Sequence, residues 1–150
     1  SIKDCFKLYT TDIGILVAML DYGTQMDILK GNLLGYKGAI FENLMADFLC
    51  KSGQNLYYFH KDSGLELDFL VRFKGECTVV EIKAKGGKSK SLNTVLKNKH
   101  VYHVNHAIKL GNYNVGRDGD ILTIPLYMGF LVKDTLTLAT IPDVDLSLLT

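Results

Sequence analysis

The fold of this chain is decided by residues 65–83, which read LELDFLVRFKGECTVVEIK. In residues 65–71, Leu65, Leu67, Phe69 and Val71 alternate with Glu66 and Asp68, and a second strand-like run follows from 78 to 83. Lys74-Gly75 interrupts the pattern between the two runs. Two such runs around a short turn that contains glycine are typical of a β-hairpin. We therefore predict an antiparallel hairpin that turns at Lys74-Gly75.

The predicted turn determines which side chains meet across the hairpin. With a two-residue turn, Asp68 lies opposite Glu81, and Glu66 lies opposite Lys83. Side chains alternate between the two faces of a strand, so all four project from the same face. The spacing thus predicts a cluster of three carboxylates and one lysine, with Asp68 and Glu81 directly adjacent.

Two interpretations of this cluster are open. Adjacent carboxylates at Asp68 and Glu81 repel each other, and their site needs a proton or a cation. Mg²⁺ prefers one or two carboxylates with waters, and a lysine beside that ion suits phosphoryl chemistry. Alternatively, Glu66 and Lys83 form a cross-strand ion pair that contributes a few tenths of a kcal/mol. Asp68 and Glu81 would then lie on a solvent-facing sheet face.

Helices and further strands are expected on both sides of the hairpin. From 38 to 51 the apolar residues recur with helical period, with Glu42 at the edge of the buried stripe. Asn43 and Asp47 are expected to face water. The order of elements predicts an α/β fold, with a mixed sheet flanked by helices. Other strands are expected at 6–9, 56–59, 104–110 and 121–124, other helices at 13–20 and 89–98, and a polar loop at 111–119.

Composition indicates an ordinary globular domain. A chain of 150 residues, 47% hydrophobic and 22% charged, suits a single domain that spans 1–150. The longest apolar run, 13–20, is far too short to cross a bilayer, so no membrane partner is expected. The three cysteines, Cys5, Cys50 and Cys77, form no C-x-x-C pair. They indicate a reducing, cytoplasmic location and are expected to be small buried residues.

Positive charge is concentrated in one window. From 82 to 117 the chain has seven lysines and one arginine and no acidic residue, so the remainder of a chain with net charge +1 carries −7. Such a block suits a polyanion, although a solvated lysine-rich face has the same composition. On the first interpretation we expect backbone-type contacts with DNA or RNA from Lys85, Lys88, Lys90, Lys97 and Lys99.

A nucleotide cofactor site is not expected. Gly86-Gly87-Lys88-Ser89 resembles the end of a phosphate-binding loop, but the full pattern requires glycine at position 82, where the chain has Ile82.

The hairpin motif resembles a known family. Leu67-Asp68, then twelve residues, then Glu81-Ile82-Lys83, preceded by a helix with Glu42, is similar to the PD-(D/E)XK nuclease signature. Over nearly its whole length the chain also resembles the uncharacterised domain that follows the AAA ATPase core in many predicted ATPases, domain of unknown function 4143. That second resemblance is carried by Phe6-Lys7-Leu8-Tyr9, Asp12-Ile13-Gly14, Gly38 with Phe41-Glu42-Asn43, Tyr57-Tyr58-Phe59, Glu66-Leu67-Asp68-Phe69, Val80-Glu81-Ile82-Lys83, Ser91-Leu92 and Ile124-Pro125-Leu126-Tyr127.

The resemblance implies a restriction-endonuclease-like core and specific roles. Asp68 and Glu81 would bind Mg²⁺, Glu42 would assist from its helix, and Lys83 would be the catalytic lysine. Two departures are Leu67, where the signature has proline, and the absence of a glutamine in the helix after Lys83. The resemblance further implies that 1–150 is the C-terminal part of a longer AAA ATPase, and we expect 135–150 to be a loosely ordered tail.

Three functions follow as alternatives. The first is a Mg²⁺-dependent nuclease that acts on DNA or RNA beside an upstream ATPase motor. The second is a catalytically inactive module that binds nucleic acid or protein. The third is a domain that organises the ATPase assembly, a role that is compatible with an oligomer. Fold alone does not decide among them.

Overall fold

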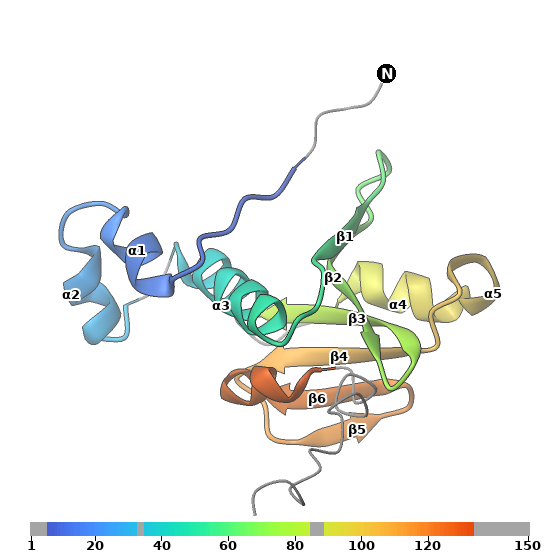
Figure 1. Ribbon diagram of the computed structural model, residues 1–150. Coiled ribbons are helices and arrows are strands. Elements are labelled where there is room, and N and C mark those ends of the chain that lie inside the picture. The colour runs from blue at the N-terminus through green and yellow to red at the C-terminus, as the bar shows by residue number, and fades with distance from the viewer. Residues whose placement is uncertain (1–5, 33–34, 85–88, 134–150) are drawn as a thin grey trace, which may run out of the picture.

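A six-stranded mixed sheet forms the centre of the computed structural model, which describes residues 6–32, 35–84 and 89–133 (Figure 1). The strand order is β1-β2-β3-β4-β6-β5. The first three strands are antiparallel, β4 and β6 run parallel to β3, and β5 returns antiparallel at the far edge. The strands are β1 (Tyr57–His60), β2 (Glu66–Phe73), β3 (Glu76–Lys83), β4 (His106–Gly111), β5 (Gly116–Asp118) and β6 (Ile121–Pro125).

Helices cover both faces of the sheet, which confirms the predicted mixed α/β fold (Figure 1). A long helix and a terminal 3₁₀ helix pack on one face, and two helices in the crossover between β3 and β4 lie on the other. Two short helices stand to the side of the sheet. The helices are α1 (Ile13–Ala18), α2 (Thr24–Leu29), α3 (Lys37–Lys51), α4 (Lys90–Lys97), α5 (Lys99–Tyr102) and η1 (Leu126–Leu131). Within the described ranges, none of them is long and apolar enough to cross a membrane.

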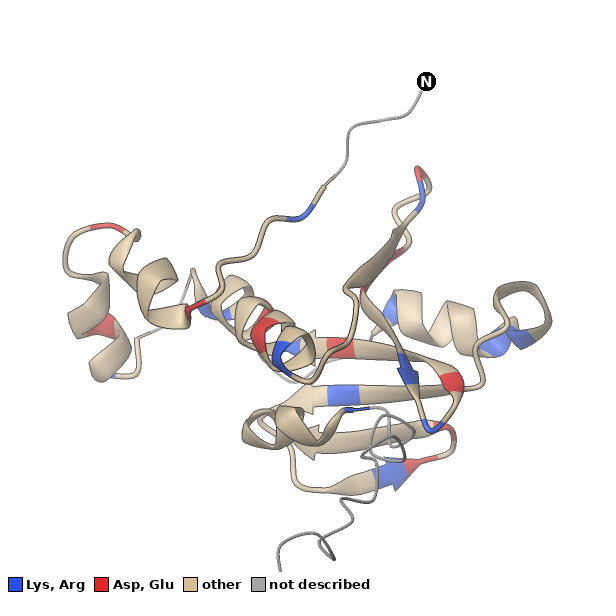
Figure 2. Ribbon diagram, viewed as in Figure 1, with Lys and Arg blue, Asp and Glu red and all other residues tan. Residues whose placement is uncertain are grey.

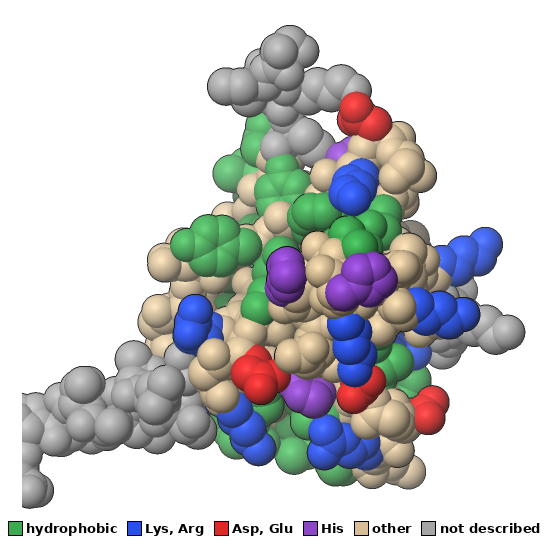
Figure 3. Space-filling view, turned by 90° about the vertical axis from the view of Figure 1, so that its right-hand side faces the viewer, with side chains coloured by type: hydrophobic (Ala, Val, Ile, Leu, Met, Phe, Trp, Pro, Cys, Tyr) green, Lys and Arg blue, Asp and Glu red, His purple; other side chains and the backbone are tan. Residues whose placement is uncertain are grey.

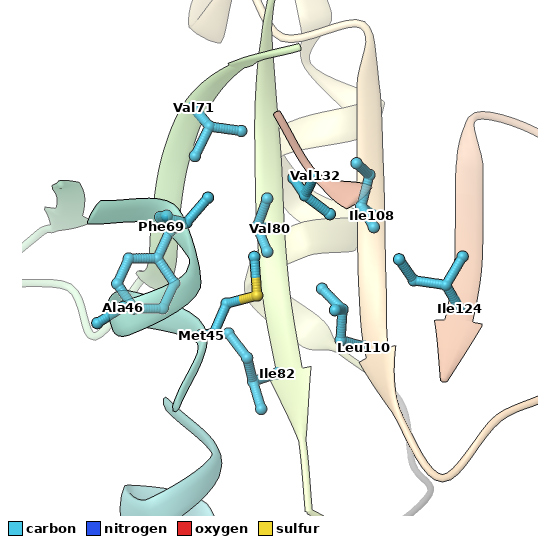
Figure 4. Packing of buried hydrophobic residues seen from close by; sticks show 11 residues of the cluster. Met45, Ala46, Phe69, Val71, Val80, Ile82, Ile108, Leu110, Ile124 and Val132 are labelled. Atoms are coloured by element: carbon cyan, nitrogen blue, oxygen red, sulfur yellow. The ribbon is translucent and has the colours of Figure 1, made fainter. Parts of the chain in front are cut away.

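Strand alternation divides the core into two clusters. Figure 4 shows the larger cluster, in which side chains of α3 meet one face of β2, β3, β4 and β6. The smaller cluster lies between the opposite face and α4, around Val79, Leu92 and Val95. Both contain only apolar side chains, so the sheet is held from both faces by burial of apolar area. The larger cluster consists of Met45, Ala46, Leu49, Phe69, Val71, Val80, Ile82, Ile108, Leu110, Ile124 and Val132.

The predicted hairpin is confirmed in its turn and in the register of the residues next to the turn. Lys74 and Gly75 have φ angles of 53° and 81°, as in the two-residue turns that match the twist of a hairpin. The paired residues run from Phe73 with Glu76 to Phe69 with Val80, as predicted. The ladder between β2 and β3 stops at that last pair, so the predicted pairs Asp68–Glu81 and Glu66–Lys83 do not belong to it.

A bulge in β2 accounts for the end of the ladder. Tyr57 of β1 faces Leu70, whereas Phe59 faces Leu67. Two residues of β2, Asp68 and Phe69, therefore oppose a single residue of β1. Such bulges locally disrupt a ladder and redirect a side chain, so strict alternation does not hold at Asp68.

Several local expectations were wrong. Residues 6–9 are extended but belong to no strand. Two short elements, α5 and β5, were not predicted because four and three residues are too few to show a periodic pattern, and β5 lies in the expected loop at 111–119. Cys50 and Cys77 are exposed rather than buried. The expected tail at 135–150 lies outside the described residues.

The expectation that Asn43 faces water was also wrong. Asn43 is buried. Its Oδ1 accepts a hydrogen bond of 2.8 Å from the Thr10 N–H, and its Nδ2 donates one of 3.0 Å to the Thr10 carbonyl. Asp47 lies at the margin of the surface and pairs with Lys51 at 2.6 Å. A helical wheel predicts which face of α3 packs on the sheet. It cannot show that a distant segment, here the one that contains Thr10, covers another face of the same helix.

A substitution at Gly111 tests how closely β4 approaches β3. An added Cβ would lie 2.4 Å from the Lys83 carbonyl oxygen and 2.9 Å from the Tyr113 ring. We expect Gly111→Ala to lower the free energy of unfolding by about 1–3 kcal/mol, because main chain must move to admit it.

Gly38→Ala is the matched control, since its Cβ would meet nothing within 4 Å. It should leave stability unchanged or raise it by up to about 1 kcal/mol through helix propensity. Urea unfolding of both variants and the parent gives the comparison. A Gly111→Ala protein as stable as the parent would contradict the close packing of β4 on β3.

Candidate functional site

Asp68 lies where β2 leaves the ladder. Its Oδ2 accepts a hydrogen bond of 2.8 Å from the main-chain N–H of Ile82. The carboxylate thus replaces the main-chain acceptor that a continued ladder would supply. Burial raises the pKa of Asp68 to about 6; the Ile82 hydrogen bond opposes this, and the charges of Glu81 and Glu42 add to it. The three carboxylates therefore lie close enough to influence one another.

Glu81 is buried and only partly satisfied. It is 5% exposed, and its Oε1 lies 2.6 Å from Nζ of Lys83, two residues further along the same strand. Its Oε2 is also buried and has no hydrogen-bond partner among the described residues. Buried polar atoms are nearly always partnered by protein, water or an ion, so this oxygen is expected to contact a water molecule or an ion.

Lys83 is kept protonated. Burial lowers its pKa, but the hydrogen bond to Glu81 and the charges of Glu81 and Asp68 raise it more, so that the net shift is upward. Tyr113, in the loop after β4, contributes to the same upward shift. At neutral pH Lys83 can therefore donate a hydrogen bond or offset negative charge, but it does not act as a general base.

Glu42 reaches the same region from α3. Its side chain is 26% exposed, at the edge of the buried face as expected, and α3 packs on the sheet beside β3 (Figure 2). Its Oε1 accepts hydrogen bonds from Nζ of Lys7 at 2.9 Å and from the hydroxyl of Tyr9 at 2.7 Å. Glu42 is thus held in place by the segment that precedes α1.

We call Phe6–Thr10 the N-terminal arm. It supplies two site residues that the sequence pattern did not reveal, Lys7 and Tyr9, and the Tyr9 ring packs 5.6 Å from that of Phe69. Burial, followed by the hydrogen bond to Glu42, raises the pKa of Tyr9 and keeps it protonated. A signal was present, because Lys7 and Tyr9 stand two apart in an extended segment and share one side. Nothing in the sequence, however, indicated what that side faces.

Glu66 pairs with Lys7 rather than with Lys83. The distance from Lys7 Nζ to Glu66 Oε1 is 2.9 Å, and this hydrogen bond lowers the pKa of Glu66. The alternative prediction, a cross-strand ion pair between Glu66 and Lys83, was therefore wrong. We call Glu42, Glu66, Asp68 and Glu81 the carboxylate cluster.

The predicted nucleic-acid-binding lysines are dispersed. Lys90 is the first residue of α4. The hydroxyl of the next residue, Ser91, accepts a hydrogen bond from the Glu66 N–H at the edge of the site. Lys97 and Lys99 lie at the other end of this helix, and Lys99 pairs with Asp120 at 2.5 Å. Figure 3 shows a face where basic side chains alternate with histidines and carboxylates. Lys85 and Lys88 lie outside the described residues.

The side chains that could hold a metal are few. Among the described residues, no group of three or more His, Cys, Asp and Glu side chains is arranged to hold an ion. The remaining donor set is the pair predicted from the sequence, Asp68 and Glu81. Two carboxylates with waters satisfy Mg²⁺, which binds few protein ligands.

The pKa of Asp68 leads to a stability prediction. Because its folded pKa of about 6 exceeds the ordinary value of 3.8, the folded protein binds this proton more tightly than the unfolded chain. The resulting stability is present below pH 4 and is lost as the pH rises through about 6. Asp68→Asn removes the charge and keeps an acceptor for Ile82. In EDTA it should raise the free energy of unfolding at pH 7.5 by on the order of 1–3 kcal/mol, and by less at pH 4.

Asp118→Asn, at an exposed position of β5, is the control and should shift stability by the same small amount at both pH values. Urea unfolding from pH 4 to pH 8 measures the difference. An Asp68→Asn effect that does not depend on pH would show that this carboxyl is solvated in the folded protein.

Comparison with known proteins identifies a family. The family model described as "Domain of unknown function (DUF4143)" matches residues 37–128, more than half of the chain. This range begins with α3 and includes the whole carboxylate cluster and Lys83, whereas the N-terminal arm lies before it. No curated protein and no solved structure matches the chain. The chain therefore belongs to the family of domain of unknown function 4143.

Proposed function

We propose that this domain hydrolyses phosphodiester bonds in DNA or RNA with a bound Mg²⁺, in the manner of PD-(D/E)XK nucleases. The observation that carries the proposal is the buried, unpartnered Oε2 of Glu81 beside Asp68, whose pKa is raised. A divalent cation between these two carboxylates would satisfy the oxygen and relieve their repulsion. A purely structural ion pair between Glu81 and Lys83 would leave the buried Oε2 of Glu81 without a partner.

The chain's own residues suit such a reaction. Asp68 and Glu81 would hold the ion, with Asp68 fixed by its hydrogen bond from Ile82. When bound, Mg²⁺ would acidify a water molecule and offset charge on the phosphate. Lys83, protonated and adjacent to Glu81, would donate a hydrogen bond to the phosphate oxygens as negative charge develops there. Glu42, which Lys7 and Tyr9 hold in place, would orient the water molecules of the site.

The same proposal includes the setting of the domain. Lysines of the 82–117 window would contact the nucleic-acid backbone without reading sequence, with Lys90 nearest to the carboxylate cluster among the lysines of α4 and α5. An AAA ATPase motor upstream in a longer cytoplasmic protein would supply the substrate. This part of the proposal is supported by the resemblance of nearly the whole chain to the uncharacterised domain that follows the AAA ATPase core in many predicted ATPases.

A nuclease assay tests the proposal. Purified protein is incubated with single- and double-stranded DNA and RNA in Mg²⁺ or Mn²⁺. We expect cleavage that Asp68→Ala and Lys83→Ala each reduce on the order of 100-fold or more, since each removes a group that acts in the transition state. Lys51→Ala changes an exposed lysine at the end of α3, outside the 82–117 window, and should retain most of the cleavage rate.

Cleavage that survives both Asp68→Ala and Lys83→Ala would eliminate this site. A second candidate function is a module that binds without cutting, and it is favoured by the small donor set of two carboxylates. Nucleic-acid binding that weakens with added salt, without cleavage in any substrate, would select that function. Absence of both nucleic-acid binding and cleavage would leave the third function, in which the domain organises an ATPase assembly.

A further inference from the structure

The two halves of the carboxylate cluster differ in how their charge is compensated. Glu42 and Glu66 share one ammonium group, because Nζ of Lys7 lies 2.9 Å from an oxygen of each. In the other half, Lys83 engages only Oε1 of Glu81, while Oε2 of Glu81 has no partner among the described residues. One half is thus closed by the protein, and the other accepts a further ligand.

Lys7 is well held in its position. Its ammonium lies 5.7 Å from the centre of the Tyr58 ring, and its side chain is 20% exposed. The two hydrogen bonds and the charges of Glu42 and Glu66 raise its pKa despite burial, which acts in the opposite direction, so it stays charged. The rest of the N-terminal arm is fixed independently, by the bonds between Thr10 and Asn43 and between Tyr9 and Glu42.

We propose that Lys7 takes the place of a second metal ion, so that the carboxylate cluster binds a single divalent cation, at Asp68 and Glu81. This inference rests on the proposed metal site. Oxygens of Glu42 and Glu66 already converge on the one point occupied by the ammonium nitrogen. Without the Lys7 charge, these oxygens form a second position for a hard cation, which prefers oxygen ligands. Lys7 is therefore a residue that determines the number of metal ions, and it lies outside the range that the family model matches.

The metal content of Lys7 variants tests this proposal. Mn²⁺ is titrated into the protein, and free Mn²⁺ is followed by electron paramagnetic resonance. We expect the parent to bind one ion and Lys7→Gln to bind two. Lys7→Arg keeps the positive charge and should bind one ion. The double variant Lys7→Gln/Glu66→Gln removes one carboxylate together with the ammonium, and the count should return to one.

A second control leaves the charges of the cluster unchanged. Tyr9→Phe removes a hydrogen bond of Glu42 without a change of charge and should leave the Mn²⁺ count at one. Unchanged circular dichroism shows that each variant is folded.

The outcomes separate the two proposals. A parent protein that binds no Mn²⁺ would overturn the metal site at Asp68 and Glu81. A parent and a Lys7→Gln protein that each bind one ion would overturn only the role of Lys7. A second ion in Lys7→Gln that persists in Lys7→Gln/Glu66→Gln would also overturn it, because the ion would then lie elsewhere.

Discussion

The hydrogen bond from the Ile82 N–H to the Asp68 carboxylate is the interaction on which the site depends. It occurs where the β2–β3 ladder stops, so it satisfies a main-chain donor that the sheet interior would otherwise leave unpaired. The same bond draws the carboxylate out of solvent and towards Glu81, where burial and repulsion favour its neutral form. Asp68 therefore both completes the hydrogen bonding of the sheet and places a carboxylate near Glu81. An asparagine could also accept the hydrogen bond from Ile82, so this bond alone does not account for an acidic residue at position 68.

The hairpin could be predicted from the sequence because its determinants are local. A period of two, a turn with two positive φ angles, and the register that follows from it all lie within residues 65–83. The helical period of 38–51 likewise located Glu42 at the edge of its buried face. The bulge at Asp68 could not be predicted, because it arises from pairing with β1, whose register is set by a different turn. Lys7 and Tyr9 could not be assigned either, since each meets Glu42 across more than thirty residues of chain.

The lysine-rich window shows a related limit of sequence patterns. Neighbouring lysines along the chain are separated in space, because α4 carries Lys90 and Lys97 to opposite ends and Lys99 turns to Asp120. Charge that is concentrated along the sequence is thereby divided between the neighbourhood of the carboxylate cluster and a mixed surface (Figure 3). Long-range attraction of a polyanion depends on the summed field, and close contacts depend on the few cations that reach the site.

The way in which the N-terminal arm is attached has a consequence for its motions. Phe6 and Leu8 are 77% and 87% exposed, and the arm is fixed mainly by polar contacts at Lys7, Tyr9 and Thr10. Detaching it uncovers little apolar surface apart from the Tyr9–Phe69 contact. An opening of this kind costs far less than global unfolding and depends weakly on denaturant, since that dependence scales with the surface exposed. The amide of Thr10 should therefore exchange its proton through local openings, whereas the amides of β3 and β4 should exchange only when the whole sheet unfolds.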